Sequence, residues 1–266
     1  MPMDNRDTES REVTRPDGTT IRYTVSGPAD GPAMTLIHGW GCDRRDFDAI
    51  IGFLPGHHRV LAVDLAEHGD SRSTRDVWTI TEFARDVAAV LEAESVSSSV
   101  VVGHSLGGAV AVETARLLPA VVTRVVAVEA LHYLSLFPAQ DEPEAEALLR
   151  LFREDFAGAM RGMVEGGSPA GTDPALIDAY TKKMAAVRQP AGLHSLEGLL
   201  RWDMDAALRE VAQPIVVFAV RSLITQEAAD RYGGRLRIEL VDLGSHHFHA
   251  ESPEATAGLL AGQMSD

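Results

Sequence analysis

The stretch Val100–Glu113, VVVGHSLGGAVAVE, decides the fold of this chain. Its opening valines are typical of a strand that is buried on both faces, and the helical pattern that follows them is ended by Pro119. Between strand and helix lies Gly103–Gly107, a G-x-S-x-G motif in the strand–turn–helix context that it requires. The glycines leave room for a sharp turn that lifts Ser105 above the sheet. We therefore predict that Ser105 is a nucleophile and that the first amides of the following helix face the reacting oxygen.

Short β-branched runs alternate with longer helical patterns on both sides of this stretch. Strands separated by helix-length segments need crossover connections, so the pattern predicts an α/β fold with a mostly parallel sheet and helices on both faces. The predicted strands are Ile21–Val25, Ala33–Ile37, His58–Val63, Ser99–Val102, Thr123–Val128, Ile215–Val220 and Leu236–Val241. The predicted helices of this part are Asp43–Leu54, Thr79–Leu91, Ser105–Leu118 and Pro253–Gln263.

The alternation stops between residues 131 and 201, where helical patterns occur without a strand. Glu144–Val164 carries a stripe of Leu, Phe and Met residues, and Pro174–Ala186 and Gly192–Leu200 predict two shorter helices. Because the sheet pattern resumes afterwards, we predict one core, residues 1–130 and 202–266, with residues 131–201 inserted as a helical cap. A separate helical domain is the alternative.

The composition of the 266 residues is that of a soluble globular protein, with 45% hydrophobic and 24% charged residues. The net charge of −15 would repel nucleic acid and anionic membranes, so we expect neither as a partner, only a small-molecule substrate, and we leave a homodimer open. The one cysteine, Cys42, cannot form an internal disulfide or hold a metal alone. A polar N-terminus and the lack of a membrane-length apolar run predict a cytoplasmic protein.

Two further segments, TLIHGW at Thr35–Trp40 and GSHHFHAESPE at Gly244–Glu254, complete a resemblance. Together with Val100–Glu113 they resemble the α/β-hydrolase family over nearly the whole chain, most weakly in residues 131–201. The resemblance implies the α/β-hydrolase fold: a mostly parallel, twisted sheet flanked by helices, with an inserted helical cap. It also implies that the amides of Trp40 and Leu106 form an oxyanion hole. It further implies that substrate contacts come from the following residues: His38, Trp40 and His104.

A serine hydroxyl needs a base, which in this family comes late in the chain. The late segment offers three histidines, and the family pattern of His-Phe with Glu and Pro downstream matches His247. His246 and His249 are the alternatives. A metal site on these histidines is disfavoured, because no carboxylate lies at ligand spacing and neighbouring residues point apart. We predict no metal and no cofactor.

The third member of the triad must hold the imidazole and stabilise its charged form. Many relatives place an Asp after the strand that corresponds to Ile215–Val220, but the loop Arg221–Thr225 contains no carboxylate. A minority of the superfamily places the acid after the strand that follows the nucleophile helix, where this chain has Glu129. We predict Glu129 as the acid, with Glu227 as its rival.

The predicted function is hydrolysis of a carboxylic ester or lactone of a small, partly apolar substrate through an acyl-enzyme. The placement of Glu129 is also similar to lactone hydrolases and to cofactor-independent quinolone dioxygenases. The alternative function is therefore a cofactor-independent 2,4-dioxygenase of an N-heteroaromatic substrate that uses only the His/acid dyad. Dehalogenation is disfavoured because those relatives use an Asp where this chain has Ser105, and a non-enzymatic receptor is disfavoured because Ser105 and His247 are both retained.

Overall fold

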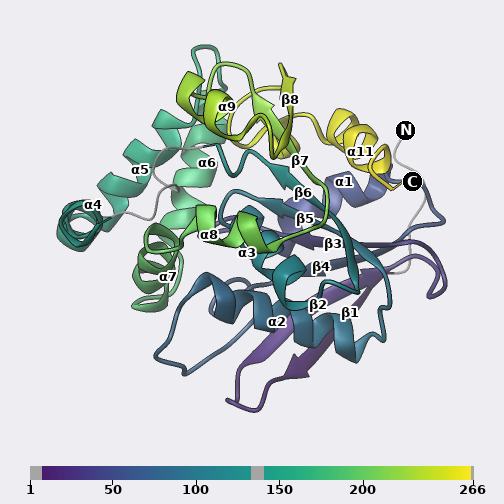
Figure 1. The fold of residues 1–266 in the computed structure, drawn as a ribbon. Helices are drawn as coiled ribbons and strands as arrows, with labels where there is room; N and C mark the ends of the chain where they lie inside the picture. The colour runs from purple at the N-terminus through teal and green to yellow at the C-terminus, as the bar shows by residue number, and fades with distance from the viewer. Residues whose placement is uncertain (1–7, 133–140, 265–266) are drawn as a thin grey trace.

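A computed structural model describes residues 8–132 and 141–264. An eight-stranded sheet forms its centre, with the strand order β1-β2-β4-β3-β5-β6-β7-β8 (Figure 1). Strands β1 and β2 run antiparallel to their neighbours, and all pairs from β4 to β8 are parallel. The strands are β1 Thr8–Thr14, β2 Thr20–Ser26, β3 Ala33–Ile37, β4 Arg59–Val63, β5 Ser99–His104, β6 Val122–Val128, β7 Ile215–Val220 and β8 Arg237–Val241. The predicted α/β class and mostly parallel sheet are confirmed.

Helices cover both faces of the sheet, and alternate strand residues point to each face. In β6, Val125 and Ala127 belong to one apolar cluster, whereas Val126 and Val128 belong to the other. This period of two is what a strand buried on both faces requires. The helices of one face are α2 Ile80–Ala93, α3 Leu106–Leu117 and α8 Met204–Glu210, and those of the other are α1 Asp48–Phe53 and α11 Pro253–Ala261. The remaining short helices are η1 Arg44–Phe47, α9 Gln226–Tyr232 and α10 Phe248–Glu251.

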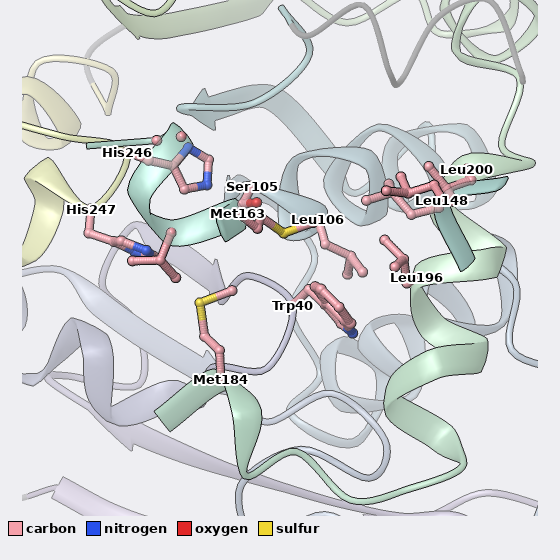
Figure 2. Close-up of a pocket in the computed structure, with 14 residues that line it drawn as sticks. Trp40, Ser105, Leu106, Leu148, Met163, Met184, Leu196, Leu200, His246 and His247 are labelled. Atoms are coloured by element: carbon pink, nitrogen blue, oxygen red, sulfur yellow. The ribbon is translucent and has the colours of Figure 1, made fainter. Parts of the chain in front are cut away.

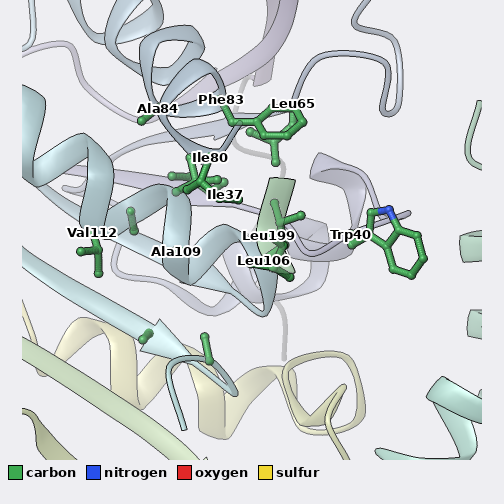
Figure 3. Close-up of a cluster of buried hydrophobic side chains, with 14 of the residues drawn as sticks. Ile37, Trp40, Leu65, Ile80, Phe83, Ala84, Leu106, Ala109, Val112 and Leu199 are labelled. Carbon is green, nitrogen blue, oxygen red and sulfur yellow. The ribbon is translucent and has the colours of Figure 1, made fainter. Parts of the chain in front are cut away.

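Between β6 and α8 the described residues form four helices, which lie together beside the sheet (Figure 1). They are α4 Glu142–Glu154, α5 Phe156–Gly166, α6 Pro174–Ala185 and α7 Ala191–Leu200, and we call them the inserted helices. The larger apolar cluster continues without a break from the sheet into this group, as Leu199 of α7 and Trp40 show (Figure 3). The inserted helices therefore share a hydrophobic core with the sheet.

Two expectations about elements need correction. The stripe over Glu144–Val164 is not one helix, because Asp155 leaves helical geometry at φ −148° and ψ 85° and its side chain accepts a hydrogen bond from the amide of Gly158. Thr8–Thr14, which carried no strand signal, pairs with β2 as an exposed edge strand. No helix among residues 8–132 and 141–264 is long and apolar enough to cross a membrane.

Candidate active site

Ser105 occupies a strained turn between β5 and α3. Its backbone has φ 53° and ψ −121°, a conformation that costs a non-glycine residue free energy and recurs at functional sites. Gly107 makes the turn sterically feasible, because a Cβ atom at this position would collide with the backbone carbonyl of Ile37. Ser105 lines a cavity at the carboxyl ends of the parallel strands, where open α/β sheets bind their ligands.

The loop after β3 approaches this turn closely. A Cβ atom on Gly39 would lie 2.9 Å from Nδ1 of His104 and 3.1 Å from Cβ of Ser105, so glycine permits the approach. Trp40 and Leu106 both line the cavity with Ser105. The indole Nε1 of Trp40 donates to the carbonyl of Gly192 in α7 at 2.8 Å. The indole is thus fixed to the inserted helices.

His38 and His104 do not line this cavity. The ring of His38 bridges two backbone groups, with Nδ1 2.7 Å from the carbonyl of Gly39 and Nε2 accepting from the amide of Leu65 at 3.0 Å. Nε2 of His104 donates to the carbonyl of His246 at 2.9 Å. We predicted that both residues contact substrate. In the structure they instead form hydrogen bonds with the backbone of the loops around Ser105.

Glu129 lies at the end of β6 with a positive φ of 46° and is completely buried. Its carboxylate accepts from the amide of Val220, and Oε2 lies 3.4 Å from Nε2 of His132 and 3.4 Å from Nδ1 of His246. Burial alone would raise the pKa of Glu129, but the hydrogen bonds from His132 and His246 outweigh it and lower the pKa to about 2. The rival acid, Glu227, is exposed on α9 and does not line the cavity.

The structure brings Glu129 together with His246, whereas we expected this pairing for His247. The ring of His246 lines the cavity and points toward Ser105 (Figure 2). The ring of His247 stacks on Tyr180 of α6, with centroids 3.6 Å apart and planes at 10°, and its buried Nδ1 has no hydrogen-bond partner among the described residues. The physical reason is that adjacent residues of this loop point in different directions, so only one histidine can reach the acid.

The direction of His246 depends on the inserted helices. Its backbone amide donates to the carbonyl of Gly167, just beyond α5, at 2.8 Å. A Cβ atom on Gly167 would lie only 2.9 Å from Cβ of His246. The position of the histidine loop is thus coupled to the end of α5, which the local sequence around His246 does not reveal.

Three other buried histidines, His104, His247 and His249, form the one group found among the described residues that could hold a metal ion. One ring nitrogen from each lies within 4.8 Å of the others. Burial lowers the pKa of all three, so they are neutral at pH 7, which is the form that binds metals. Our expectation of no metal considered only the late histidines and missed that His104 of β5 lies beside them.

The cavity beside Ser105 has a volume of about 220 Å³ (Figure 2). Most of its wall is apolar, and the polar side chains that the described residues contribute are the serine and two histidines. The lining residues come from the sheet loops and from all four inserted helices: Trp40, Ser105, Leu106, Leu148, Met163, Val164, Gly166, Gly167, Met184, Leu196, Leu199, Leu200, His246 and His247.

Comparisons with known proteins agree with this architecture. A family model described as "Alpha/beta hydrolase family" matches residues 36–259. The chain is 30% identical over 246 residues to a putative carbamate hydrolase RutD from Variovorax paradoxus, covering 87% of this chain and 90% of the relative. It is 31% identical over 222 residues to a pimeloyl-[acyl-carrier protein] methyl ester esterase from Methylococcus capsulatus, covering 79% and 84%. The solved structure of an esterase from Exiguobacterium antarcticum superposes with a TM-score of 0.84 at 17% identity, covering 97% of this chain and 100% of the other.

Proposed function

Because this chain belongs to the alpha/beta hydrolase family, we propose that it is a serine hydrolase that cleaves carboxylic esters or lactones with Ser105, His246 and Glu129 as its triad. The observation that carries the proposal is that Ser105, on its strained turn, lines one cavity with His246, and that Nδ1 of His246 lies 3.4 Å from the buried carboxylate of Glu129. This is the nucleophile, base and orienting acid that acyl transfer needs.

In the proposed mechanism, His246 takes the proton of Ser105 as the hydroxyl oxygen attacks the ester carbonyl. The negative charge on the carbonyl oxygen is held by the amides of Trp40 and Leu106, and each such donor is worth ~3 kcal/mol in the transition state. His246 then gives its proton to the alcohol oxygen, the ester C–O bond breaks, and an acyl-serine remains. A water molecule, deprotonated by His246, hydrolyses the acyl-serine and restores the enzyme.

Glu129 stabilises the imidazolium that forms on His246 in this cycle. Its carboxylate lies on the Nδ1 side of the ring, which leaves Nε2 for the exchange with Ser105. His132 contacts the same carboxylate oxygen and helps to fix it. Glu129 holds a negative charge at all pH values above its pKa of about 2.

The relatives support ester hydrolysis as the general reaction. A methyl ester esterase and a putative carbamate hydrolase each align with more than three quarters of this chain, and both named reactions cleave a carbonyl–heteroatom bond. The relatives give no support to the dioxygenase alternative. We also propose that residues 131–201 act as a cap, since all four inserted helices of this range supply side chains to the cavity.

The test is a pre-steady-state assay with p-nitrophenyl acetate and butyrate. The wild-type protein should release a burst of about one p-nitrophenol per chain, and Ser105→Ala should abolish it. His246→Phe should lower kcat/KM by about 10⁴-fold, as expected for loss of a general base.

His247→Phe is the matched control, because phenylalanine can still stack on Tyr180. It should retain kcat/KM within about tenfold. If His247→Phe removes the burst and His246→Phe does not, the triad is Ser105, His247 and an acid other than Glu129. If Ser105→Ala retains the burst, the proposed function is wrong.

A further inference from the structure

The cavity is chemically different on the two sides of Ser105. His246 and His247 lie on one side, and Leu148, Leu196 and Leu200 lie on the other (Figure 2). Because these groups are well separated in the view, they occupy opposite ends of the cavity. A substrate whose carbonyl carbon meets Ser105 therefore extends one part toward the histidines and the other toward the leucines.

The end of the cavity lined by Leu148, Leu196 and Leu200, which we call the leucine end, is apolar. The indole of Trp40, the largest side chain there, has no polar group free to bind a substrate. Trp40, which adjoins this end, uses its only N–H on the carbonyl of Gly192. Edge contacts with Phe152 and Phe156, at ring-centroid distances of 5.2 and 5.9 Å, hold the indole from the side of α4 and α5. No charged side chain of the described residues lines the cavity. A charged group placed at this end would lose its water and gain no partner.

The chemistry decides which part of the ester each end receives. His246 must reach the alcohol oxygen to protonate it as the C–O bond breaks, so the alcohol lies on the histidine side. The acyl group stays bonded to the Oγ atom of Ser105 and extends the other way. This argument rests on the proposed function of Ser105 and His246.

We propose that the leucine end, formed by Leu148, Leu196, Leu200 and Trp40, is an acyl pocket, and that the substrates are esters of uncharged, apolar carboxylic acids of short to medium chain length. The alcohol portion leaves past His246 and the end of α5. The side chains that select the acyl group thus come from α4, α7 and the loop after β3, and the residues that select the alcohol come from another part of the cavity wall.

The volume sets the length of the acyl chain. At roughly 30 Å³ for each non-hydrogen atom, a cavity of about 220 Å³ holds about seven such atoms. Because the ester group and the alcohol at the histidine end share this space, the acyl chain is limited to at most about six carbons. Each methylene buried before that limit should raise kcat/KM about fourfold, and longer chains should add nothing or lower kcat/KM.

Leu148 is the position for the test, because it lines the cavity from α4 but is only partly buried, so a change of size there is compatible with folding. Leu151 on the same helix is 56% exposed and does not line the cavity. Leu151→Trp is therefore the matched control for Leu148→Trp. Thermal unfolding of each variant verifies that it is folded.

The experiment compares kcat/KM over two ester series. The acyl series is p-nitrophenyl acetate, butyrate, hexanoate, octanoate and decanoate, and the alcohol series is methyl, butyl and phenyl butyrate. The wild type should have its optimum at butyrate or hexanoate and should disfavour monomethyl succinate, which carries a carboxylate in its acyl part. Leu148→Trp should lower the hexanoate-to-acetate ratio by at least tenfold and leave the ratios within the alcohol series unchanged, and Leu151→Trp should match the wild type.

A flat acyl series in an enzyme that hydrolyses the acetate overturns the acyl pocket and leaves the proposed function intact. The same holds if Leu148→Trp alters the alcohol series instead, or if monomethyl succinate is preferred over methyl butyrate. Absence of any burst with the wild-type protein overturns both proposals.

Discussion

Replacement of Glu129 by glutamine tests the buried carboxylate at the centre of the proposed triad. The substitution keeps the shape of the side chain and removes its charge. The pKa of Glu129 is about 2 in the folded protein against an ordinary value of 4.5, and a difference of ~2.5 pKa units corresponds to roughly 3 kcal/mol. At pH 7 the Glu129→Gln variant should therefore be less stable than the wild type by roughly 3 kcal/mol.

The pH dependence has a definite sign. Because the pKa of Glu129 is lowered on folding, its stabilisation is fully present above pH 4.5 and is lost as the pH falls toward 2. The stability difference between wild type and variant should thus decrease to roughly 2 kcal/mol at pH 3.5. Urea unfolding followed by tryptophan fluorescence at pH 7, 5, 4 and 3.5 measures it. The same variant should lose about 10³–10⁴ in kcat on p-nitrophenyl butyrate, because the imidazolium of His246 is no longer stabilised.

Glu227→Gln is the control, since Glu227 is exposed on α9 and should change neither stability nor kcat. A stability loss in Glu129→Gln that is the same at pH 7 and pH 3.5 would refute the electrostatic argument. Loss of kcat in Glu227→Gln with Glu129→Gln fully active would refute the assignment of the acid.

Three other predictions concern the surroundings of Ser105. Gly107→Ala should destabilise the protein by about 3 kcal/mol and reduce the burst amplitude, because the new Cβ meets the carbonyl of Ile37. Urea unfolding measures the stability and active-site titration measures the burst. Wild-type values of both would contradict the geometry of the turn. Trp40→Phe loses the hydrogen bond to Gly192 and should cost about 1 kcal/mol of stability, measured by thermal unfolding, while an unchanged melting temperature would show that this bond does not tie the loop to α7. Dialysis against EDTA should leave kcat unchanged, because the proposed triad supplies both nucleophile and base. A loss of activity that one metal ion per chain restores would show that the triad does not act without a metal.

The fold could be predicted from the sequence because its strands are short apolar runs bounded by turn residues. Ala33–Ile37 and Ile215–Val220 occur with the predicted bounds. Thr8–Thr14 escaped prediction because all but one of its residues are exposed, so no apolar alternation marks it. The break at Asp155 escaped because the apolar stripe continues across it, and only the cap formed by its side chain ends one helix and starts the next.

The proposed acid and the proposed base differ in how far the sequence could locate them. Glu129 follows directly after a buried strand, and residues at the carboxyl ends of neighbouring parallel strands meet at one edge of the sheet. The choice among three histidines within four positions depends on side-chain direction. That direction is set by the contact of His246 with Gly167, which lies in a different part of the chain, and by the stacking of His247 on Tyr180. Neither contact leaves a signal in the segment that contains the histidines.

The hydrogen bond from the amide of His246 to the carbonyl of Gly167 has a consequence for protein engineering. Helical insertions of this kind invite recombination, in which a segment from one homologue is grafted onto the scaffold of another to import a new substrate range. Here a graft that replaces the inserted helices also removes an acceptor that orients the histidine loop. A chimera must therefore place a backbone carbonyl at the position of Gly167, with no side chain toward His246, before its new lining can be of use. The inserted segment and the sheet domain therefore depend on each other, and a change in one restricts the changes that the other can accept.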